Sequence, residues 1–346
     1  MVLEFVDTCM CGDYHMTMDP TEKDALAHTP MGQPLQGMPF LNGYQKFEDM
    51  ERFFAATQPP KVRFTDLSEM VSHKIIPNMM AIDVLTNFVR VTDDTVLVPI
   101  AIQVKNRDIT FTSSDGIERG RLNIYGRFTI LSGRAVQTFE DTVQVDIPHD
   151  LLPKLADNPS VYGKAVPMAP GRYRLDVVVK DVNGDRVGSR SRSITSPQFR
   201  DDQLATSSLI IADRMERMPT SDIAAGSFVI GDMRVRPRVP SPEDQPVHFR
   251  QDQKISFWMQ VYNLTTDQKT NRPSARIQYA LSPVGGASVI QNSQPSADLG
   301  LTGDQATLQK TLPAGDLKPG TYELRIRVDD LLSGQSVEPS QTFVID

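Results

Sequence analysis

Apolar and polar residues alternate along residues 170–181, and the same pattern returns at residues 319–330. Both copies begin with Pro-Gly followed by a tyrosine two positions on, and Tyr173 and Tyr322 are 149 positions apart (322 − 173). An alternation of period two with charges on one face is typical of an antiparallel strand half buried against a core. A tyrosine that opens a late strand just after a turn is also typical of the tyrosine corner of immunoglobulin-like sandwiches. The repeat therefore predicts two β-sandwiches, whose inward positions are Tyr173, Leu175, Val177 and Val179 in one copy and Tyr322, Leu324, Ile326 and Val328 in the other.

A second pair of matching segments supports an internal duplication. Gln103-Val104-Lys105-Asn106 matches Gln260-Val261-Tyr262-Asn263 at an offset of 157 (260 − 103). The two pairs of blocks occur in the same order, and their offsets differ by only eight positions (157 − 149). Such agreement favours duplication of a whole domain over chance.

Other alternating runs and turn residues predict the remaining strands. Ser132-Gly133 joins two runs in a hairpin, and Asn183-Gly184 is a strong signal for a hairpin with a type I′ turn. Besides the two repeated strands, the predicted strands are Ala81–Val91, Val96–Val104, Arg121–Leu131, Arg134–Ile147 and Arg186–Ile194, then Ser208–Ala212, Phe228–Val235, Ile255–Val261, Arg276–Leu281, Thr307–Leu312 and Gln341–Ile345.

The first 60 residues follow a different pattern. Val2–Val6 predicts a short strand that is apolar on both faces, as is typical of a strand inside a sheet. Residues 29–43 are rich in Pro and Gly, and Tyr44–Ala56 has the spacing of a modest helix. We therefore expect an all-β protein of two tandem immunoglobulin/fibronectin-like β-sandwiches, preceded by a short strand and a partly helical, loop-rich connector. The expected parts are residues 1–20 as the strand remnant of a missing upstream domain, 21–60 as the connector, 61–200 as the first sandwich and 201–346 as the second.

Composition and charge exclude several classes of protein. A net charge of −7 argues against nucleic-acid binding, which needs a basic face to displace counterions. No run approaches the roughly 18 apolar residues of a membrane-spanning helix, and the first residues lack the pattern of an export signal. Two cysteines, Cys9 and Cys11, and five scattered histidines do not supply the ligand spacing of a metal site, so no metal or cofactor is expected.

Segments that resemble catalytic or metal-binding motifs have simpler explanations. Asp181–Asp185 resembles the start of a calcium loop, but its sixth position is Arg186 and its twelfth is Arg192, so a hairpin explains it better. No nucleophile elbow, zinc-protease motif or phosphate-binding loop occurs, and no catalytic residue is predicted. Glu140 and Asp141 lie on an alternating strand, where a solvated face accounts for them.

Two aromatic residues are the candidate binding surface. Trp258 and Tyr262 alternate away from the inward set Ile255, Phe257, Met259 and Val261, so they lie on the outer face of a predicted strand. Exposed aromatic residues on a sandwich can bind a sugar or a protein. The alternative is that a neighbouring domain covers them, as happens more often with large aromatic residues.

Several runs resemble the bacterial protein family that is named for a Gly-Trp-x-Thr-Asp (GWxTD) motif. They cover nearly the whole chain and are Leu3–Asp7, Gly12–Leu26, Asn123–Arg127, Thr138–Asp141, Ala169–Leu175, Phe228–Gly231 and Val235–Arg238. The motif itself is absent, and the single tryptophan is Trp258. The resemblance implies the downstream part of such a protein, without the domain that carries the motif, and export of the full-length protein to the periplasm or outside the cell. It implies no activity and transfers no catalytic residue.

These observations predict a non-enzymatic binding or structural module, which binds another protein or positions an upstream domain. One alternative is an accessory substrate-binding part of an extracytoplasmic enzyme, and another is a carbohydrate-binding module that uses Trp258 and Tyr262. The short strand Val2–Val6 is expected to pair with the missing upstream domain, or to cause weak self-association when that domain is absent. We expect Met1 to be an internal start or the gene to be truncated.

Overall fold

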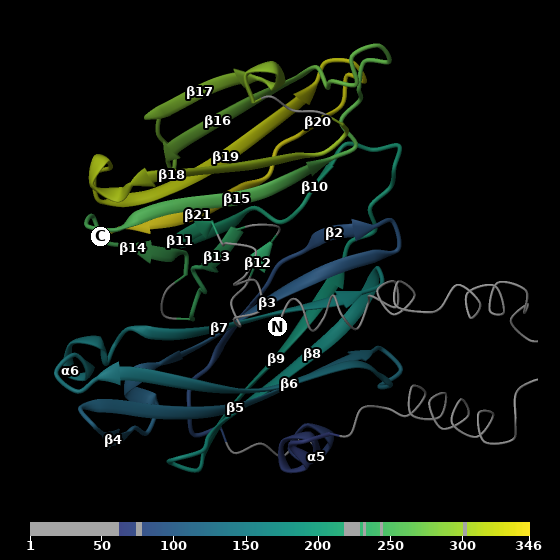
Figure 1. Ribbon diagram of the computed structural model, residues 1–346. Coiled ribbons are helices and arrows are strands. Elements are labelled where there is room, and N and C mark those ends of the chain that lie inside the picture. The colour runs from purple at the N-terminus through teal and green to yellow at the C-terminus, as the bar shows by residue number, and fades with distance from the viewer. Residues whose placement is uncertain (1–61, 74–77, 218–228, 231–232, 243–244, 300–302) are drawn as a thin grey trace, which may run out of the picture.

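The computed structural model describes residues 62–73, 78–217, 229–230, 233–242, 245–299 and 303–346. The expected strand remnant at 1–20, the connector at 21–60 and both cysteines lie outside these residues. The described chain is mostly β-strand, as predicted, and its strands form two bodies, one above the other (Figure 1). Among the described strands, no pair joins a residue before position 200 to a residue after it.

The first body is a sandwich of two antiparallel sheets with one apolar core between them. Its core contains alternate residues of both sheets, including Val98, Ile100 and Ile102 on one side and Leu122, Ile124 and Phe128 on the other. One sheet contains β1 (Asp83–Thr86), β2 (Val89–Thr92), β3 (Thr95–Lys105) and β7 (Pro159–Met168), and the other contains β4 (Thr112–Ser114), β5 (Ile117–Ile130), β6 (Ala135–Pro148), β8 (Gly171–Asp181) and β9 (Arg186–Ser196).

Short helices pack on this sandwich or connect its strands. The helix α5 (Thr65–His73) buries Leu67 and Val71 against Tyr125, Val178 and Val187 on the outer face of the β5–β8–β9 sheet. The helix α6 (Leu152–Leu155) and the 3₁₀ turn η1 (Asn106–Asp108) lie in connections between strands.

The strand predicted over Ala81–Val91 is divided into β1 and β2 because of a proline on its partner. Asn87 lies between the two strands and donates its backbone N–H to the carbonyl of Pro99 on β3 (2.9 Å). Pro99 has no N–H to return the bond, so the ladder is interrupted at this one position. The register on either side is unchanged, with Thr86 opposite Ile100 and Val89 opposite Leu97.

The hairpin at Asn183-Gly184 is confirmed, but the predicted type I′ turn is wrong. The last strand pair is Asp181 with Arg186, which leaves a four-residue loop, and the positive φ angle falls on Asp185 (52°). Contacts outside the hairpin account for the difference. The side-chain amide of Asn183 donates to the carbonyl of Thr110 (2.9 Å), and a Cβ on Gly184 would lie 2.1 Å from Thr110 Oγ1.

The second body is also a sandwich, with a core between two six-stranded sheets. Ile255, Phe257, Met259 and Val261 all face this core, as the alternation predicted. One sheet contains β10 (Ala205–Thr206), β11 (Ile210–Arg217), β12 (Val229–Ile230), β13 (Met233–Pro237), β15 (Lys254–Tyr262) and β18 (Ala306–Pro313). The other contains β14 (Val247–Phe249), β16 (Ala275–Pro283), β17 (Ile290–Pro295), β19 (Gly320–Asp330), β20 (Ser336–Val337) and β21 (Ser340–Ile345), and the short turns η3 (Ser296–Leu299) and η4 (Ala314–Asp316) connect strands.

Both predicted tyrosine corners are present. Tyr173 donates its hydroxyl to the carbonyl of Ala169 (3.0 Å), and Tyr322 donates its hydroxyl to the carbonyl of Lys318 (2.9 Å). Each tyrosine thus bonds to the backbone four residues upstream, and each follows a glycine with positive φ, 151° at Gly171 and 149° at Gly320. A residue with a Cβ is strained in this region, which explains why Gly occupies the turn in both copies.

The aspartate that ends each repeated strand has the same role in both sandwiches. Asp181 and Asp330 are buried, with 0% and 1% of their surface exposed. Asp181 Oδ2 accepts the backbone N–H of Thr110, and Asp330 Oδ2 accepts that of Thr265, both at 2.9 Å. A carboxylate that accepts backbone N–H groups can hold a loop in place, and at Asp181 the guanidinium of Arg186 also lies 3.9 Å from Oδ2. Burial alone would raise the pKa of Asp330. The hydrogen bonds from Thr265 and Ser333 outweigh this effect and hold the pKa of Asp330 below its usual value.

Candidate functional site

Trp258 and Tyr262, the candidate binding surface, are buried between the two sandwiches. Only 1% of Trp258 and 2% of Tyr262 is exposed, so neither offers a face to a ligand. They do point away from the core of their own sandwich, as predicted. The first sandwich covers them, so the interpretation as an exposed sugar- or protein-binding surface is wrong and the alternative of a covering neighbour holds.

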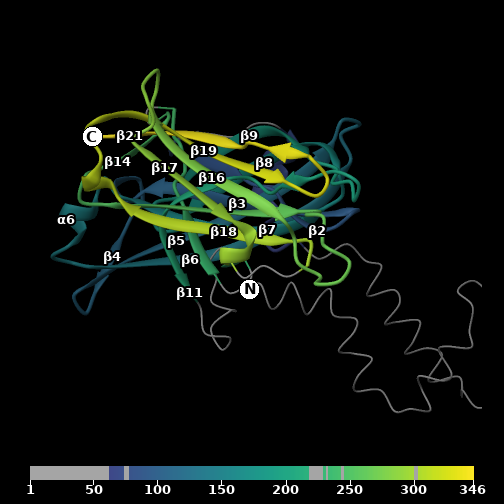
Figure 2. The same ribbon diagram turned by 90° about the horizontal axis from the view of Figure 1, so that it is seen from above.

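The joint between the sandwiches contains two small apolar clusters. Trp258 lies beside Ile210 on the neighbouring strand and packs in one cluster with Val89 and Leu97 of the first sandwich. In the second cluster Tyr262 packs with Val96 and Phe199, and its ring meets that of Phe199 edge-on at 5.3 Å. Figure 1 shows β2 and β3 directly below β10, β11 and β13, and Figure 2 shows the two bodies overlapping when they are viewed from above.

Arg90 on β2 ties the joint together through polar contacts. Its backbone N–H donates to the Tyr262 hydroxyl (3.0 Å), and its guanidinium donates to Asn263 Oδ1 (2.5 Å) and to Asp201 (2.7 Å). The guanidinium also lies 5.8 Å from the centre of the Tyr262 ring, within the range of a cation–π contact. Burial raises the pKa of Tyr262 to about 12, so its hydroxyl remains a neutral hydrogen-bonding group at all ordinary pH values.

The backbones of the two sandwiches are also bonded directly. Phe88 donates its N–H to Ser208 Oγ, and Ser208 donates its N–H to the carbonyl of Phe88, both at 2.9 Å. Asn263 donates its side-chain amide to the carbonyls of Arg200 and Gln203, which lie on the segment between the sandwiches. The linker is therefore held against the second sandwich rather than left as a free tether.

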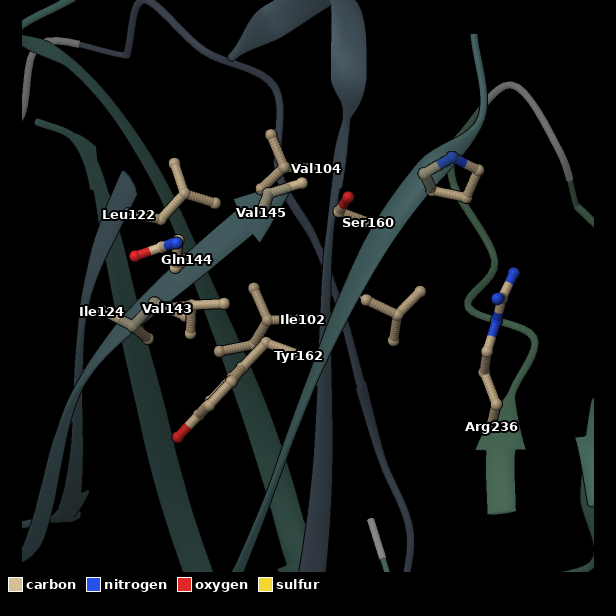
Figure 3. A pocket seen from close by; sticks show the side chains of 12 residues that line it. Ile102, Val104, Leu122, Ile124, Val143, Gln144, Val145, Ser160, Tyr162 and Arg236 are labelled. Carbon is tan, nitrogen blue, oxygen red and sulfur yellow. The ribbon is translucent and has the colours of Figure 1, made fainter. Parts of the chain in front are cut away.

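A slot opens on the flank of the first sandwich, between strands β6 and β7 (Figure 3). It encloses a cavity of about 290 Å³, and its apolar wall combines residues from both sheets. Val143 and Val145 point inward from β6 yet are only half-buried, because none of the described strands pairs with the far edge of β6. The residues that line the slot are Ile102, Val104, Leu122, Ile124, Val143, Gln144, Val145, Pro159, Ser160, Val161, Tyr162 and Arg236.

A hydrogen bond joins the two edges of the slot. Tyr162 on β7 donates its hydroxyl to Asp141 Oδ2 on β6 at 2.7 Å, and Lys164 Nζ lies 3.5 Å from the same oxygen. Burial, and then the nearby Asp141 charge, raise the pKa of Tyr162 well above its usual value. The interpretation of Asp141 as part of a solvated face is therefore wrong. Its side chain is 18% exposed and bonds to Tyr162, and the neighbouring Glu140 accepts the backbone N–H of Arg63 (2.7 Å).

Two further clefts lie beside the joint. One of about 520 Å³ is lined by residues of both sandwiches, among them Leu85, Asn87 and Arg238. Another, of about 610 Å³, lies at the bulge of β11, where Asp213 interrupts the pairing with β13. Asp213 Oδ2 lies 3.0 Å from Arg236, and burial raises the pKa of this carboxyl in spite of that arginine. Asp213 Oδ2 also lies 3.8 Å from Arg238, so this aspartate pairs with two arginines of the segment that follows β12.

The described residues hold no arrangement that suggests a reaction. No group of three or more His, Cys, Asp or Glu side chains among them could hold a metal ion. None of the helices in the described ranges is long and apolar enough to cross a membrane.

Sequence reasoning missed the residues that organise these features. Arg90 has no signal beyond a polar position on a predicted strand. Tyr162 lies in a Pro-rich connection that the pattern left unassigned. Val143 and Val145 were predicted on a strand by their alternation, but alternation does not reveal that a strand lies at the edge of a sheet.

The similarities of this chain to known proteins are found among solved structures. No family model matches it, and no curated protein matches it. Among solved structures, it is similar to the β-glucuronidase of Parabacteroides merdae with a TM-score of 0.24 and 11% identity, over 71% of this chain and 28% of that one. For the β-glucuronidase of Bacteroides uniformis the TM-score is 0.25 and the identity 9%, over 72% of this chain and 26% of that one. The chain thus spans little more than a quarter of these enzymes, and values this low assign neither a ligand nor an activity.

Proposed function

We propose that the chain is a non-enzymatic module that positions a neighbouring part of a protein assembly, with its two sandwiches acting as one rigid body. The observation that carries this proposal is the buried joint around Trp258, Tyr262 and Arg90. Interfaces between domains of one chain are commonly small and polar, and they allow relative motion. A joint with a fully buried tryptophan and hydrogen bonds across it instead favours a fixed geometry.

The resemblance to the GWxTD family supports the same proposal. The resemblance implies a motif-bearing domain before residues such as Leu3–Asp7. A rigid pair of sandwiches could hold such a domain at a fixed distance from its neighbours. In the rival proposal the upstream domain is catalytic and the sandwiches hold its substrate or partner. A carbohydrate-binding module has less support, because the aromatic residues that suggested it are covered by the first sandwich.

The rigid-body proposal is tested by a distance measurement between the sandwiches. Spin labels are attached at Leu131→Cys, 88% exposed in the first sandwich, and Val284→Cys, 62% exposed in the second, with Cys9 and Cys11 replaced by serine. We expect one narrow distance distribution, as narrow as that of a control pair within the first sandwich, Leu131→Cys with Val182→Cys. A broad or two-peaked distribution for the inter-sandwich pair alone would overturn the proposal.

A glycan array with the full chain addresses the carbohydrate alternative. We expect no selective binding, because the described residues expose no pair of aromatic rings at the predicted positions. Selective binding of one glycan class would favour that alternative over a purely positioning role.

A further inference from the structure

No described strand fills the slot between β6 and β7. Among the described strands β6 pairs only with β5, and β7 pairs only with β3, so each presents a free edge toward the slot. β6 runs from Ala135 to Pro148, which is long for an edge strand. Free edges of this length are normally shortened, charged or covered, because their unpaired N–H and C=O groups invite pairing with another strand.

The chemistry of the slot matches an extended polypeptide better than a small molecule. Its two edges offer backbone donors and acceptors, which only another strand satisfies along its whole length. Its wall is apolar, and the half-buried Val143 and Val145 line it together with Ile102 and Leu122 (Figure 3). The bond between Tyr162 and Asp141 joins the two edges at one end, so the free part of β6 extends from there to Pro148. A segment of about five residues with alternate apolar side chains fits this opening.

The start of the described chain lies at the same edge. Arg63 donates its backbone N–H to Glu140 Oε2 on β6 at 2.7 Å, so the first described residues lie beside β6. From Glu140 to Val145 is about 17 Å along an extended strand, at about 3.3 Å per residue. When extended, the segment of residues 1–61 is many times longer than the distance from Glu140 to Val145. Its attachment also gives it a high effective concentration at the slot.

We propose that the slot is the docking site of the chain's own run Val2–Val6, which adds a strand between β6 and β7 with Leu3 and Phe5 directed into the cavity. The run is apolar at alternate positions on both sides, and its single charged residue, Glu4, falls on the side away from the cavity. This inference rests on the proposed function, since it names the surface by which the rigid body holds the part of the protein that precedes it.

Hydrogen exchange of the full chain tests the proposal. In the double variant Leu3→Glu with Phe5→Glu, we expect backbone amides at the free edges, within Val143–Ile147 and Ser160–Tyr162, to exchange about tenfold faster than in the parent chain. The matched control is Phe47→Glu with Phe53→Glu, which changes two apolar residues elsewhere before Arg63 and should leave these amides unchanged. Equal exchange in the parent and the Leu3 and Phe5 variant would overturn the proposal, and so would an equal effect of the control.

Disulfide trapping gives an independent readout. With Cys9 and Cys11 replaced by serine, Phe5→Cys and Val145→Cys should form an intramolecular bond under mild oxidation, and Phe5→Cys with Val91→Cys should not. A bond that forms only between molecules, with edge protection that rises with protein concentration, would overturn the proposal in favour of a second copy in the slot. Failure of either test leaves the distance between Leu131 and Val284 unaffected, so it is distinguishable from failure of the rigid-body proposal.

Discussion

The joint predicts that a destabilising substitution in the core of the first sandwich also shifts the unfolding transition reported by Trp258 in the second. Ile100 is fully buried in the core of the first sandwich, with 0% of its surface exposed. Replacing a buried isoleucine by alanine costs about 2–5 kcal/mol, from lost burial and from the cavity left behind. We therefore expect Ile100→Ala to lower the free energy of unfolding by about 3 kcal/mol. Trp258 is the only tryptophan of the chain, so its fluorescence reports on the joint alone.

The assay is urea unfolding followed by Trp258 fluorescence and by far-ultraviolet circular dichroism. If the sandwiches unfold together, the slope is at least about 3 kcal/mol per molar urea, so the fluorescence midpoint should fall by up to about 1 M. The matched control is Val91→Ala, also in the first sandwich but 56% exposed, which should change the free energy by less than about 0.5 kcal/mol. The reasoning is refuted if Ile100→Ala leaves the fluorescence midpoint unchanged while circular dichroism shows an earlier, separate transition.

Three further outcomes follow from the geometry. Tyr173→Phe and Tyr322→Phe should each lose about 1–2 kcal/mol in urea unfolding, because the backbone carbonyl at each corner loses its donor, and neutral effects would show that these hydroxyls contribute nothing. Tyr262 has a folded pKa of about 12 against about 10 when unfolded. Its contribution to the free energy of unfolding is therefore complete below about pH 10. This contribution is lost at about 1.4 kcal/mol per pH unit as pH rises from about 10 through about 12. Tyr262→Phe should flatten that alkaline decline, and an unchanged decline would assign it to other groups. Gly188→Ala should cost about 1–3 kcal/mol, because its Cβ would lie 2.4 Å from the backbone oxygen of Met80, and an unchanged melting temperature would contradict this packing.

Local pattern was enough to predict the fold class and the repeated corners. The signal at Tyr173 and Tyr322 is contained in a few neighbouring residues, a Pro-Gly turn and an alternation of period two. The inward residues of β15 followed from the same rule, and the structure confirms them. Properties of this kind depend on which way a side chain points from its own strand, and that is fixed by the backbone.

What covers a side chain depends on distant parts of the chain, and there the predictions failed. Alternation placed Trp258 on the outer face but could not show that Leu97, more than 150 positions earlier, would cover it. Asp141 looked solvated because its partner Tyr162 comes from a strand of the opposite sheet. Asn183 looked like part of a tight turn because its bond to Thr110 is not visible in local sequence. In each case a contact between strands overrides the local preference.

The hairpin of β12 and β13 makes the two sides of the joint different from each other. The first sandwich uses β2, which pairs with β3, to meet its neighbour. In the second sandwich β11 pairs with β15 as β1 and β2 pair with β3, but the far half of β11 is already paired with β13. Among the described strands, the first sandwich has none that corresponds to β13, and Met233 and Val235 of this strand pack in the same joint. The two sandwiches therefore meet through unequal surfaces, because part of what fills the joint on the side of the second sandwich has no counterpart among the described strands of the first.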